Sequence, residues 1–137
     1  GTFTNCTFSN NIGLNGGAVS INSLPATFAF TGCTFTGNNA GGGGTGGGAV
    51  YVGNGNTTTF TNCTFTSNTA GTLSGGAVNK FAGTLSLVNC SFSLNTAGTA
   101  GAIYSSSGGY DMDRCRFTEN AATSQQAGAA YNNGGTA

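Results

Sequence analysis

The sequence contains no histidine and no tryptophan, a single proline, and few charged side chains. Three basic and three acidic residues make up 4% of its 137 positions. So low a charge offers no electrostatic footprint for a polyanion, and we expect no nucleic-acid partner. Without histidine, and without a Cys-x-x-Cys pair among the five cysteines, we expect no zinc site and no other cofactor.

Long apolar runs are also missing. None approaches the roughly 18 residues that mark a membrane-spanning helix, and the chain does not open with a basic segment followed by an apolar one. We therefore expect no direct insertion into a membrane. The length suits one domain, and we interpret residues 1–137 as a single segment of a longer protein whose targeting signal lies elsewhere.

The sequence does contain a repeat, because the pattern Cys-x-Phe-x-x-Asn occurs five times. Its cysteines are Cys6, Cys33, Cys63, Cys90 and Cys115, its phenylalanines are Phe8, Phe35, Phe65, Phe92 and Phe117, and its asparagines are Asn11, Asn38, Asn68, Asn95 and Asn120. A large apolar residue, Phe3 in the first unit, stands three positions before each cysteine. Phenylalanine at such regular positions indicates a packed core rather than a disordered glycine-rich chain.

A second motif, Gly-Gly-Ala-Val in its fullest form, follows each first one. It occupies positions 16–19, 47–50 and 75–78, and looser versions stand at 100–103 and 127–130. Successive units are 25 to 30 residues long, as the pairs Cys90 to Cys115 and Cys33 to Cys63 show at the two extremes. A fixed period of this size indicates a solenoid or a repeat array.

The residue pattern within each unit decides between kinds of solenoid. Short alternating runs of Thr, Phe and Val broken by Gly and Asn favour strands over helices. The units are too short for the four strands of a propeller blade. The sequence therefore predicts an all-β protein, a right-handed parallel β-helix of about five coils with 25 to 30 residues in each.

Alternation along each strand assigns its two faces. The cysteine and the phenylalanine two residues later share one side, and the Thr or Ser residues around them share the other. We expect an internal column of Phe with the cysteines beside it, and a ladder of hydrogen-bonded Asn amides. Since the apolar residue before each cysteine must also face inward, the chain is predicted to bend at Thr4-Asn5 and its equivalents.

These residues resemble the Gly-Gly-Ala-[Ile/Leu/Val] and Phe-x-x-Asn repeats of chlamydial polymorphic membrane proteins, and they also look like β-helix repeats in surface and flagellar-hair proteins of algae. The Phe-x-x-Asn half is present in all five units, whereas the glycine half departs from the pattern at positions 100–103 and 127–130. The resemblance implies an extracellular or cell-surface location and a role in display, adhesion or assembly. It implies no particular chemistry, because function is grafted onto such scaffolds.

Our first functional hypothesis is an extracellular structural or adhesive β-helix module, such as a subunit of a filament or surface appendage, and not an enzyme. Open strand edges at the ends of such a stack pair readily with other edges. We therefore expect end-to-end association of the protein with itself, or association with other surface proteins.

The five cysteines, one per coil, allow two interpretations. An oxidising compartment would favour disulfides, yet thiols at equivalent positions of neighbouring coils lie parallel rather than facing each other, which strains the preferred torsion. We favour buried, unreactive thiols that pack as small apolar groups.

A second functional hypothesis is ice binding by outward hydroxyl columns. The candidate residues are Thr7, Thr34 and Thr64 in one column and Thr36 and Thr66 in the next. They would form a flat array with about 6.6 Å between alternate residues and about 4.8 Å between coils, the type of lattice that ice-binding β-solenoids present. The alternative is that Thr is simply a good exposed strand residue, and Arg116 interrupts the array.

A third hypothesis is a carbohydrate-active, pectin-lyase-like enzyme or a carbohydrate-binding β-helix, and it rests on the charged last unit. Asp111 and Asp113 would lie roughly 6.6 Å apart along a strand, near the separation of the two carboxyl groups in inverting glycosidases. Arg116 follows them. No other unit supplies a carboxylate, so a solvated cluster that keeps this end soluble is the expected interpretation.

Four Asn-x-Ser/Thr sequons are candidate glycosylation sites, at Asn5, Asn56, Asn62 and Asn89. In a eukaryote, glycans there would offset the lack of surface charge. Chance occurrence is the alternative in a chain so rich in Asn and Thr, and neighbouring coils leave little room for every site to be filled. Three tyrosines recur after the glycine motif: Tyr51, Tyr104 and Tyr131. They could form an exposed contact stripe, and partly buried strand residues are the equally good alternative.

Overall fold

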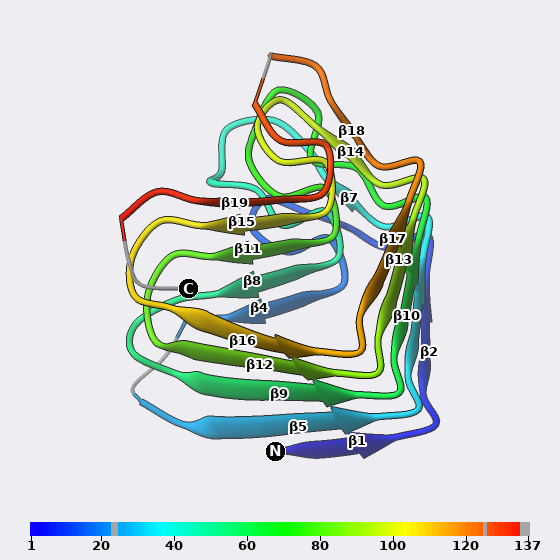
Figure 1. Ribbon diagram of the computed structural model, residues 1–137, viewed down its shortest axis with the longest axis vertical. Helices are drawn as coiled ribbons and strands as arrows, with labels where there is room; N and C mark the ends of the chain where they lie inside the picture. Colours follow the sequence, from blue (N-terminus) through cyan, green and yellow to red (C-terminus); the bar gives the residue numbers. More distant parts are fainter. Residues whose placement is uncertain (23–24, 125, 135–137) are drawn as a thin grey trace.

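The computed structural model describes residues 1–22, 25–124 and 126–134. Every regular element among these residues is a short β-strand. The backbone winds five times around one axis, and each strand pairs in parallel with the equivalent strand of the neighbouring coil (Figure 1). The prediction of an all-β parallel β-helix with about five coils is therefore confirmed.

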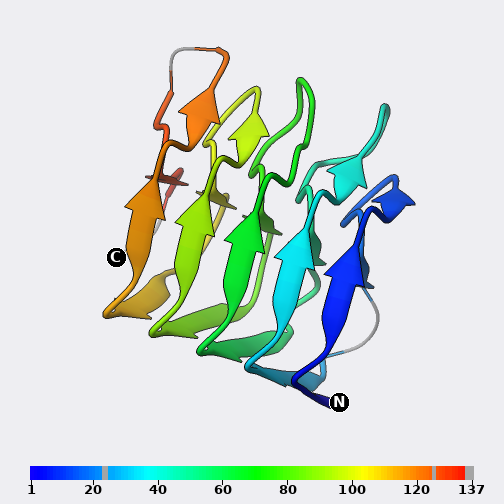
Figure 2. The same cartoon turned by 90° about the vertical axis from the view of Figure 1, so that its right-hand side faces the viewer.

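Three five-stranded sheets form the sides of the coil. The first sheet contains β1 (Thr2–Thr4), β5 (Thr27–Thr31), β9 (Thr57–Thr61), β12 (Thr84–Val88) and β16 (Tyr110–Asp113). The second sheet, seen face on in Figure 2, contains β2 (Thr7–Ser9), β6 (Thr34–Thr36), β10 (Thr64–Thr66), β13 (Ser91–Ser93) and β17 (Arg116–Thr118). The third sheet contains β4 (Val19–Ile21), β8 (Val50–Val52), β11 (Val78–Lys80), β15 (Ile103–Ser105) and β19 (Ala130–Asn132).

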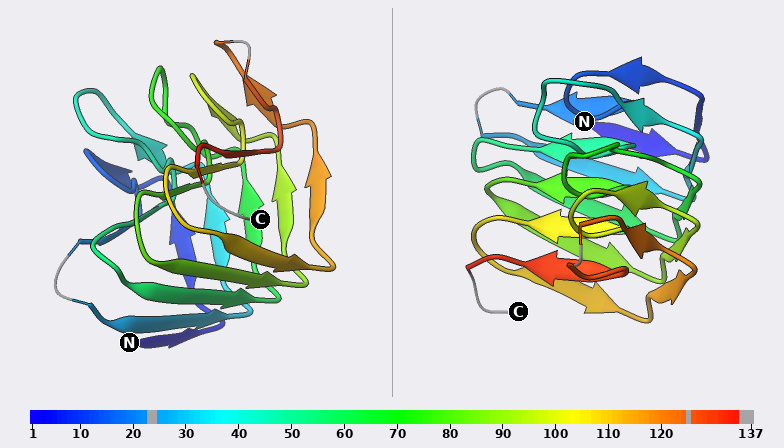
Figure 3. Two further views of the ribbon diagram at one scale, coloured as in Figure 1. Left: turned by 60° about the vertical axis from the view of Figure 1, so that its left-hand side comes forward. Right: turned by 90° about the horizontal axis from the view of Figure 1, so that it is seen from above.

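Two small pairings lie between the second and third sheets. β3 (Ile12–Gly13) pairs with β7 (Asn39–Ala40), and β14 (Thr96–Ala97) pairs with β18 (Ala121–Ala122). The connections that leave them for the third sheet differ in length and stand out from one side of the stack (Figure 3). The largest differences in connection length between coils therefore lie on this side.

Rings stack on rings through the core because the register places like residues on like. In the second sheet the aligned residues are Phe8, Phe35, Phe65, Phe92 and Phe117. Neighbouring ring centroids in this column are 4.7–4.9 Å apart, with planes within 8° of parallel. A second column in the first sheet joins Phe3, Phe30 and Phe60 and continues as Leu87 and Met112.

The two columns meet edge to face inside the coil. The Phe60 and Phe65 centroids are 5.2 Å apart with planes at 77°, a favourable geometry for the ring quadrupoles. Both rings are fully buried. The core is therefore continuous along the axis, with the Phe columns on the first and second sheets and aliphatic residues such as Val50, Val78 and Ile103 on the third.

Single residues in the left-handed conformation turn the corner between the first and second sheets. They are Asn5, Gly32, Asn62, Asn89 and Arg114, with φ between 52° and 63°. Asn tolerates this conformation better than most residues and Gly adopts it freely. One such residue reverses the inward alternation, which explains how residues an odd number of positions apart both face the core.

The second glycine of the glycine motif permits close approach between coils. A Cβ built on Gly48 would lie 1.9 Å from the carbonyl oxygen of Gly76, and one on Gly76 would lie 2.0 Å from that of Gly101. No side chain fits at such a distance. This requirement explains why the second glycine persists at position 101, where the first has become Ala100.

The tyrosines on the outer face of the third sheet are partly or fully buried, which fits the second of the two interpretations of these residues. Tyr51 is only 6% exposed, and Tyr104 and Tyr131 are half-buried, with ring centroids 5.8 Å apart. The neighbouring Asn79 is buried and donates a hydrogen bond to the Thr45 carbonyl in the longest connection. Asn79 is the register neighbour of Tyr51, so the connection that contacts Asn79 runs along the same outer face.

Candidate functional site

A ladder of asparagine side chains follows the second sheet along the interior. It contains Asn11, Asn38, Asn68, Asn95 and Asn120. Each Nδ2 donates to the Oδ1 of the next Asn at 2.8–2.9 Å, and that Oδ1 also accepts the backbone N–H of the donor residue at 3.0 Å.

Every hydrogen-bonding group of the central ladder amides is engaged. The Nδ2 of Asn68, for example, also donates to the Phe35 carbonyl at 3.0 Å. Two amide hydrogens and two oxygen lone pairs are all that this side chain offers. The ladder therefore holds the coils in register and leaves no polar group of its central members for a ligand.

The five cysteines are free, and they line the interior beside the Phe column. Cys33, Cys63 and Cys90 are buried, and the Cys63 thiol lies 3.4 Å from the carbonyl oxygens of Phe30 and Thr61. Burial raises the pKa of Cys33, and a hydrogen bond with the Cys63 thiol together with burial raises the pKa of Cys90. The same hydrogen bond with Cys90 lowers the pKa of Cys63 to about 7. Because Cys33, Cys63 and Cys90 are all buried, their thiols suit packing better than reaction with a partner in solvent.

The predicted hydroxyl columns lie on the outer face of the second sheet. Thr7, Thr34 and Thr64 form one column and Thr36 and Thr66 belong to the next. Thr7 is exposed and the other four are half-buried. Toward the fourth coil the hydroxyls pair with one another, since Ser91 donates to Thr64 at 3.3 Å and the Thr66 and Ser93 oxygens are 3.1 Å apart.

A wider hydroxyl array, which the sequence reasoning missed, covers the outer face of the first sheet. We call it the first-sheet array. Its columns are Thr27, Thr57 and Thr84, then Thr2, Ala29, Thr59 and Ser86, then Thr4, Thr31, Thr61 and Val88. The signal was present as alternating Thr at positions 57, 59 and 61. The apolar residue three positions before each cysteine predicts only the inward side of this strand, so the outward Thr residues did not enter the prediction.

Comparison with known proteins supports the architecture. A protein family described as a right-handed β-helix region matches residues 1–137, the whole chain. The chain belongs to the right-handed β-helix family. No curated protein and no solved structure matches it significantly. The more specific resemblance to chlamydial or algal surface repeats stays a prediction.

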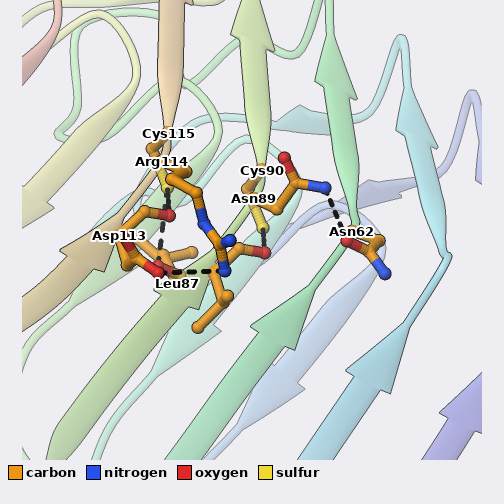
Figure 4. Close-up of polar contacts among 8 residues, drawn as sticks. Asn62, Leu87, Asn89, Cys90, Asp113, Arg114 and Cys115 are labelled. Atoms are coloured by element: carbon orange, nitrogen blue, oxygen red, sulfur yellow. Dashed lines mark hydrogen bonds and ion pairs between the residues drawn. The ribbon is translucent and has the colours of Figure 1, made fainter.

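Three of the four sequons of this right-handed β-helix lie at the exposed corner between the first and second sheets. Asn5, Asn62 and Asn89 are all exposed. The Nδ2 of Asn89 donates to the Oδ1 of Asn62 at 2.7 Å (Figure 4). These two side chains therefore occupy one shared strip of surface, and glycosylation at either stays a prediction.

The fourth sequon lies in a different environment from the other three. Asn56 is fully buried. Its Oδ1 accepts the Ala26 backbone N–H at 2.9 Å, and its Nδ2 donates to the carbonyl of Ile21 at 3.3 Å and to that of Gly53. A glycan on this nitrogen is incompatible with the folded β-helix, because it would break these bonds and open the corner.

The charged residues of the last coil do not converge on one site. Asp111 and Asp113 lie on the outer face of the first sheet, whereas Arg116 lies on the second sheet, beyond the corner. Asp113 instead pairs with the exposed corner residue Arg114 at 3.1 Å (Figure 4). A surface pair of this kind contributes little to stability.

Lys80 is a buried cation on the inner side of β11. Its neighbours in register are Val52 and Ser105. The Nζ donates to the Ser105 hydroxyl at 3.4 Å and to the Ser107 carbonyl, and within the described ranges no carboxylate pairs with it. Burial lowers the pKa of Lys80.

The part of the chain that the structure describes contains no pocket, no group of His, Cys, Asp or Glu side chains suited to a metal ion, and no helix long and apolar enough to cross a membrane. The outer sheet faces and the two end coils are therefore the surfaces that could contact a partner.

Proposed function

We propose that this β-helix is a structural or adhesive module outside the cytoplasm, part of a surface layer, filament or appendage. The observation that carries the proposal is the unbroken in-register stack of Phe rings and Asn amides. Each coil contacts its neighbours through identical groups, so the stack extends by repetition. Partners would then meet regular outer faces rather than a cleft.

The Asn ladder gives the stack a direction that suits head-to-tail association. Asn11 donates through its backbone N–H and its Nδ2 to Asn38, while Asn120 accepts the corresponding bonds from Asn95. A further coil at either end would continue the same donor and acceptor pattern, whether it belonged to this polypeptide or to a second copy. Paired strand edges would add backbone hydrogen bonds.

Sedimentation velocity over a range of protein concentrations tests this association. We expect the sedimentation coefficient to rise with concentration, and Met112→Lys to suppress the rise because it places a charge at the end of the otherwise apolar first-sheet column. Leu94→Lys is the matched control, since Leu94 is similarly exposed (49% against 40%) but lies at a corner between coils. A concentration-independent monomer for the wild-type protein would overturn end-to-end association.

The location can be tested on the native source. Immunogold electron microscopy should place the protein on the outer surface or on appendages of intact cells. Gold confined to the cytoplasm would contradict the proposal. Glycopeptide mass spectrometry of the same material would show whether Asn5, Asn62 or Asn89 carries a glycan.

Ice binding is a second candidate function, favoured by the flat hydroxyl-bearing faces. Apart from the last coil, the outer faces of the first and second sheets carry no charged residue in the described ranges. Threonine hydroxyl and methyl groups repeat there at about 4.8 Å between coils. Thermal hysteresis and faceted ice crystals are expected, whereas unaltered ice growth would remove this candidate.

A further inference from the structure

The two hydroxyl-bearing faces differ in how many of their hydroxyl groups already make hydrogen bonds within the protein. On the second sheet, Thr64 pairs with Ser91 and Thr66 with Ser93. On the first-sheet array, no hydroxyl makes a hydrogen bond to another described residue. An unpaired hydroxyl offers both its donor and its acceptors to a partner, whereas a paired one must first give up a bond.

The first-sheet array is also the wider surface. Its strands β5, β9 and β12 each span five residues and present three outward positions, against two on the three-residue strands of the second sheet. Coil three supplies a complete row, Thr57, Thr59 and Thr61. Ala29 and Val88 are the two positions in coils two to four without a hydroxyl. The array is thus repetitive along the strands and across the coils.

The chemistry of the first-sheet array restricts its partner. It carries no charge before Asp111, so it does not attract an ionic surface. The aromatic residues of the described first-sheet strands, Phe3, Phe28, Phe30, Phe60 and Tyr110, all pack against the core. A face without outward rings lacks the stacking surface that aromatic side chains provide. A neutral partner with its own two-dimensional repeat of hydrogen-bonding oxygens fits best, and ice is such a partner.

We propose that the outer face of β5, β9 and β12, rather than the predicted face of the second sheet, is the surface that contacts ice. This inference rests on the ice-binding function proposed above. Thr59 lies at the centre of the contact surface, with Thr57 and Thr61 on either side along β9. The residues predicted from sequence, Thr64 and Thr66, lie around the corner and are not required for contact.

The test compares one lysine substitution at the centre of each face. Thr59→Lys and Thr64→Lys both change half-buried outward residues of the third coil. We expect Thr59→Lys to abolish most of the thermal hysteresis and Thr64→Lys to leave it close to wild type. Melting temperatures of both variants verify folding, and Thr57→Lys, at an exposed position, replaces Thr59→Lys if the latter unfolds.

The possible outcomes distinguish an error in the choice of face from an absence of ice binding. Loss of activity in Thr64→Lys alone would keep ice binding and overturn the choice of face. No hysteresis in the wild-type protein would remove both. As a gain-of-function check, Ala29→Thr with Val88→Thr fills the two gaps in the first-sheet array and should raise the hysteresis, whereas an unchanged or lower value would count against this face.

Discussion

The two halves of each coil are held together in different ways. From the first sheet to the ladder Asn, every coil has the same length, and Phe, Cys and Asn each stack on their own kind. From that Asn to the third sheet, the length varies, and the connection at 41–46 is glycine-rich. Identical stacked side chains thus fix the register of the first half, whereas the second half varies in length and requires a particular residue, glycine, mainly where coils approach closely.

The largest difference between the halves should appear on insertion. Two glycines added between Gly42 and Gly43 should cost less than about 1 kcal/mol, because lengthening a surface loop changes its closure entropy only slightly and a Cβ at either position would meet nothing within 4 Å. The same insertion between Phe65 and Thr66 should abolish cooperative unfolding, since it displaces Asn68 from the ladder. Chemical denaturation measures both, and equal effects would refute the comparison.

A cavity in the stacked half should be the next largest effect. Phe65→Ala should lower the free energy of unfolding by about 3 to 5 kcal/mol, because it removes a fully buried ring from a close-packed column. Phe81→Ala, at a position 51% exposed, is the control and should cost much less. A loss below about 1 kcal/mol for Phe65→Ala would mean that its ring does not lie in a packed column.

Removing one ladder amide should cost about 3 kcal/mol at the centre and about 1 kcal/mol at Asn11. Asn68→Ala leaves buried groups of Asn38, Asn95 and Phe35 without their partners, while Asn11 makes a single side-chain hydrogen bond. Urea unfolding of both variants measures the two losses in free energy of unfolding. Equal losses would indicate that the amides act independently of burial.

Lys80 should make stability depend on pH. Because burial lowers its pKa, the unfolded chain binds more protons between the folded-state pKa and the unfolded value near 10.4, so this residue makes stability rise with pH in that window. The raised pKa values of Cys33 and Cys90 act in the opposite direction and the lowered pKa of Cys63 acts in the same direction, but Lys80→Met retains all three thiols. The stability of the wild-type protein relative to Lys80→Met should therefore increase toward alkaline pH. A difference in stability that does not change with pH would contradict the burial of Lys80.

The smallest expected effect is a stabilisation in the second half. Ala100 has φ 58°, where the glycine motif of the first three coils has Gly. Ala100→Gly should raise the free energy of unfolding by about 1 kcal/mol by relieving this left-handed strain. Ala102→Gly, which is buried and has an ordinary φ, should instead destabilise. A lower melting temperature for Ala100→Gly would show that the position carries no strain.

The stacked half was largely predictable from sequence. Repeat spacing aligns Phe65 with its counterparts, and alternation places its ring inside. The burial of Asn56, Tyr51 and Lys80 was not predictable in the same way, because it depends on the paths of connections and on which coil lies above or below. The first-sheet array could have been found from Thr57, Thr59 and Thr61, but its unpaired hydroxyls are visible only in three dimensions.

In-register stacking of the coils is tested most directly by nuclear Overhauser contacts between aromatic rings. Phe35, Phe65 and Phe92 are successive in the column, with centroids 4.7 Å apart, so ring protons of Phe65 should show strong contacts to both neighbours. Well-resolved spectra in which Phe65 contacts neither ring would contradict the stacked β-helix and everything inferred from it.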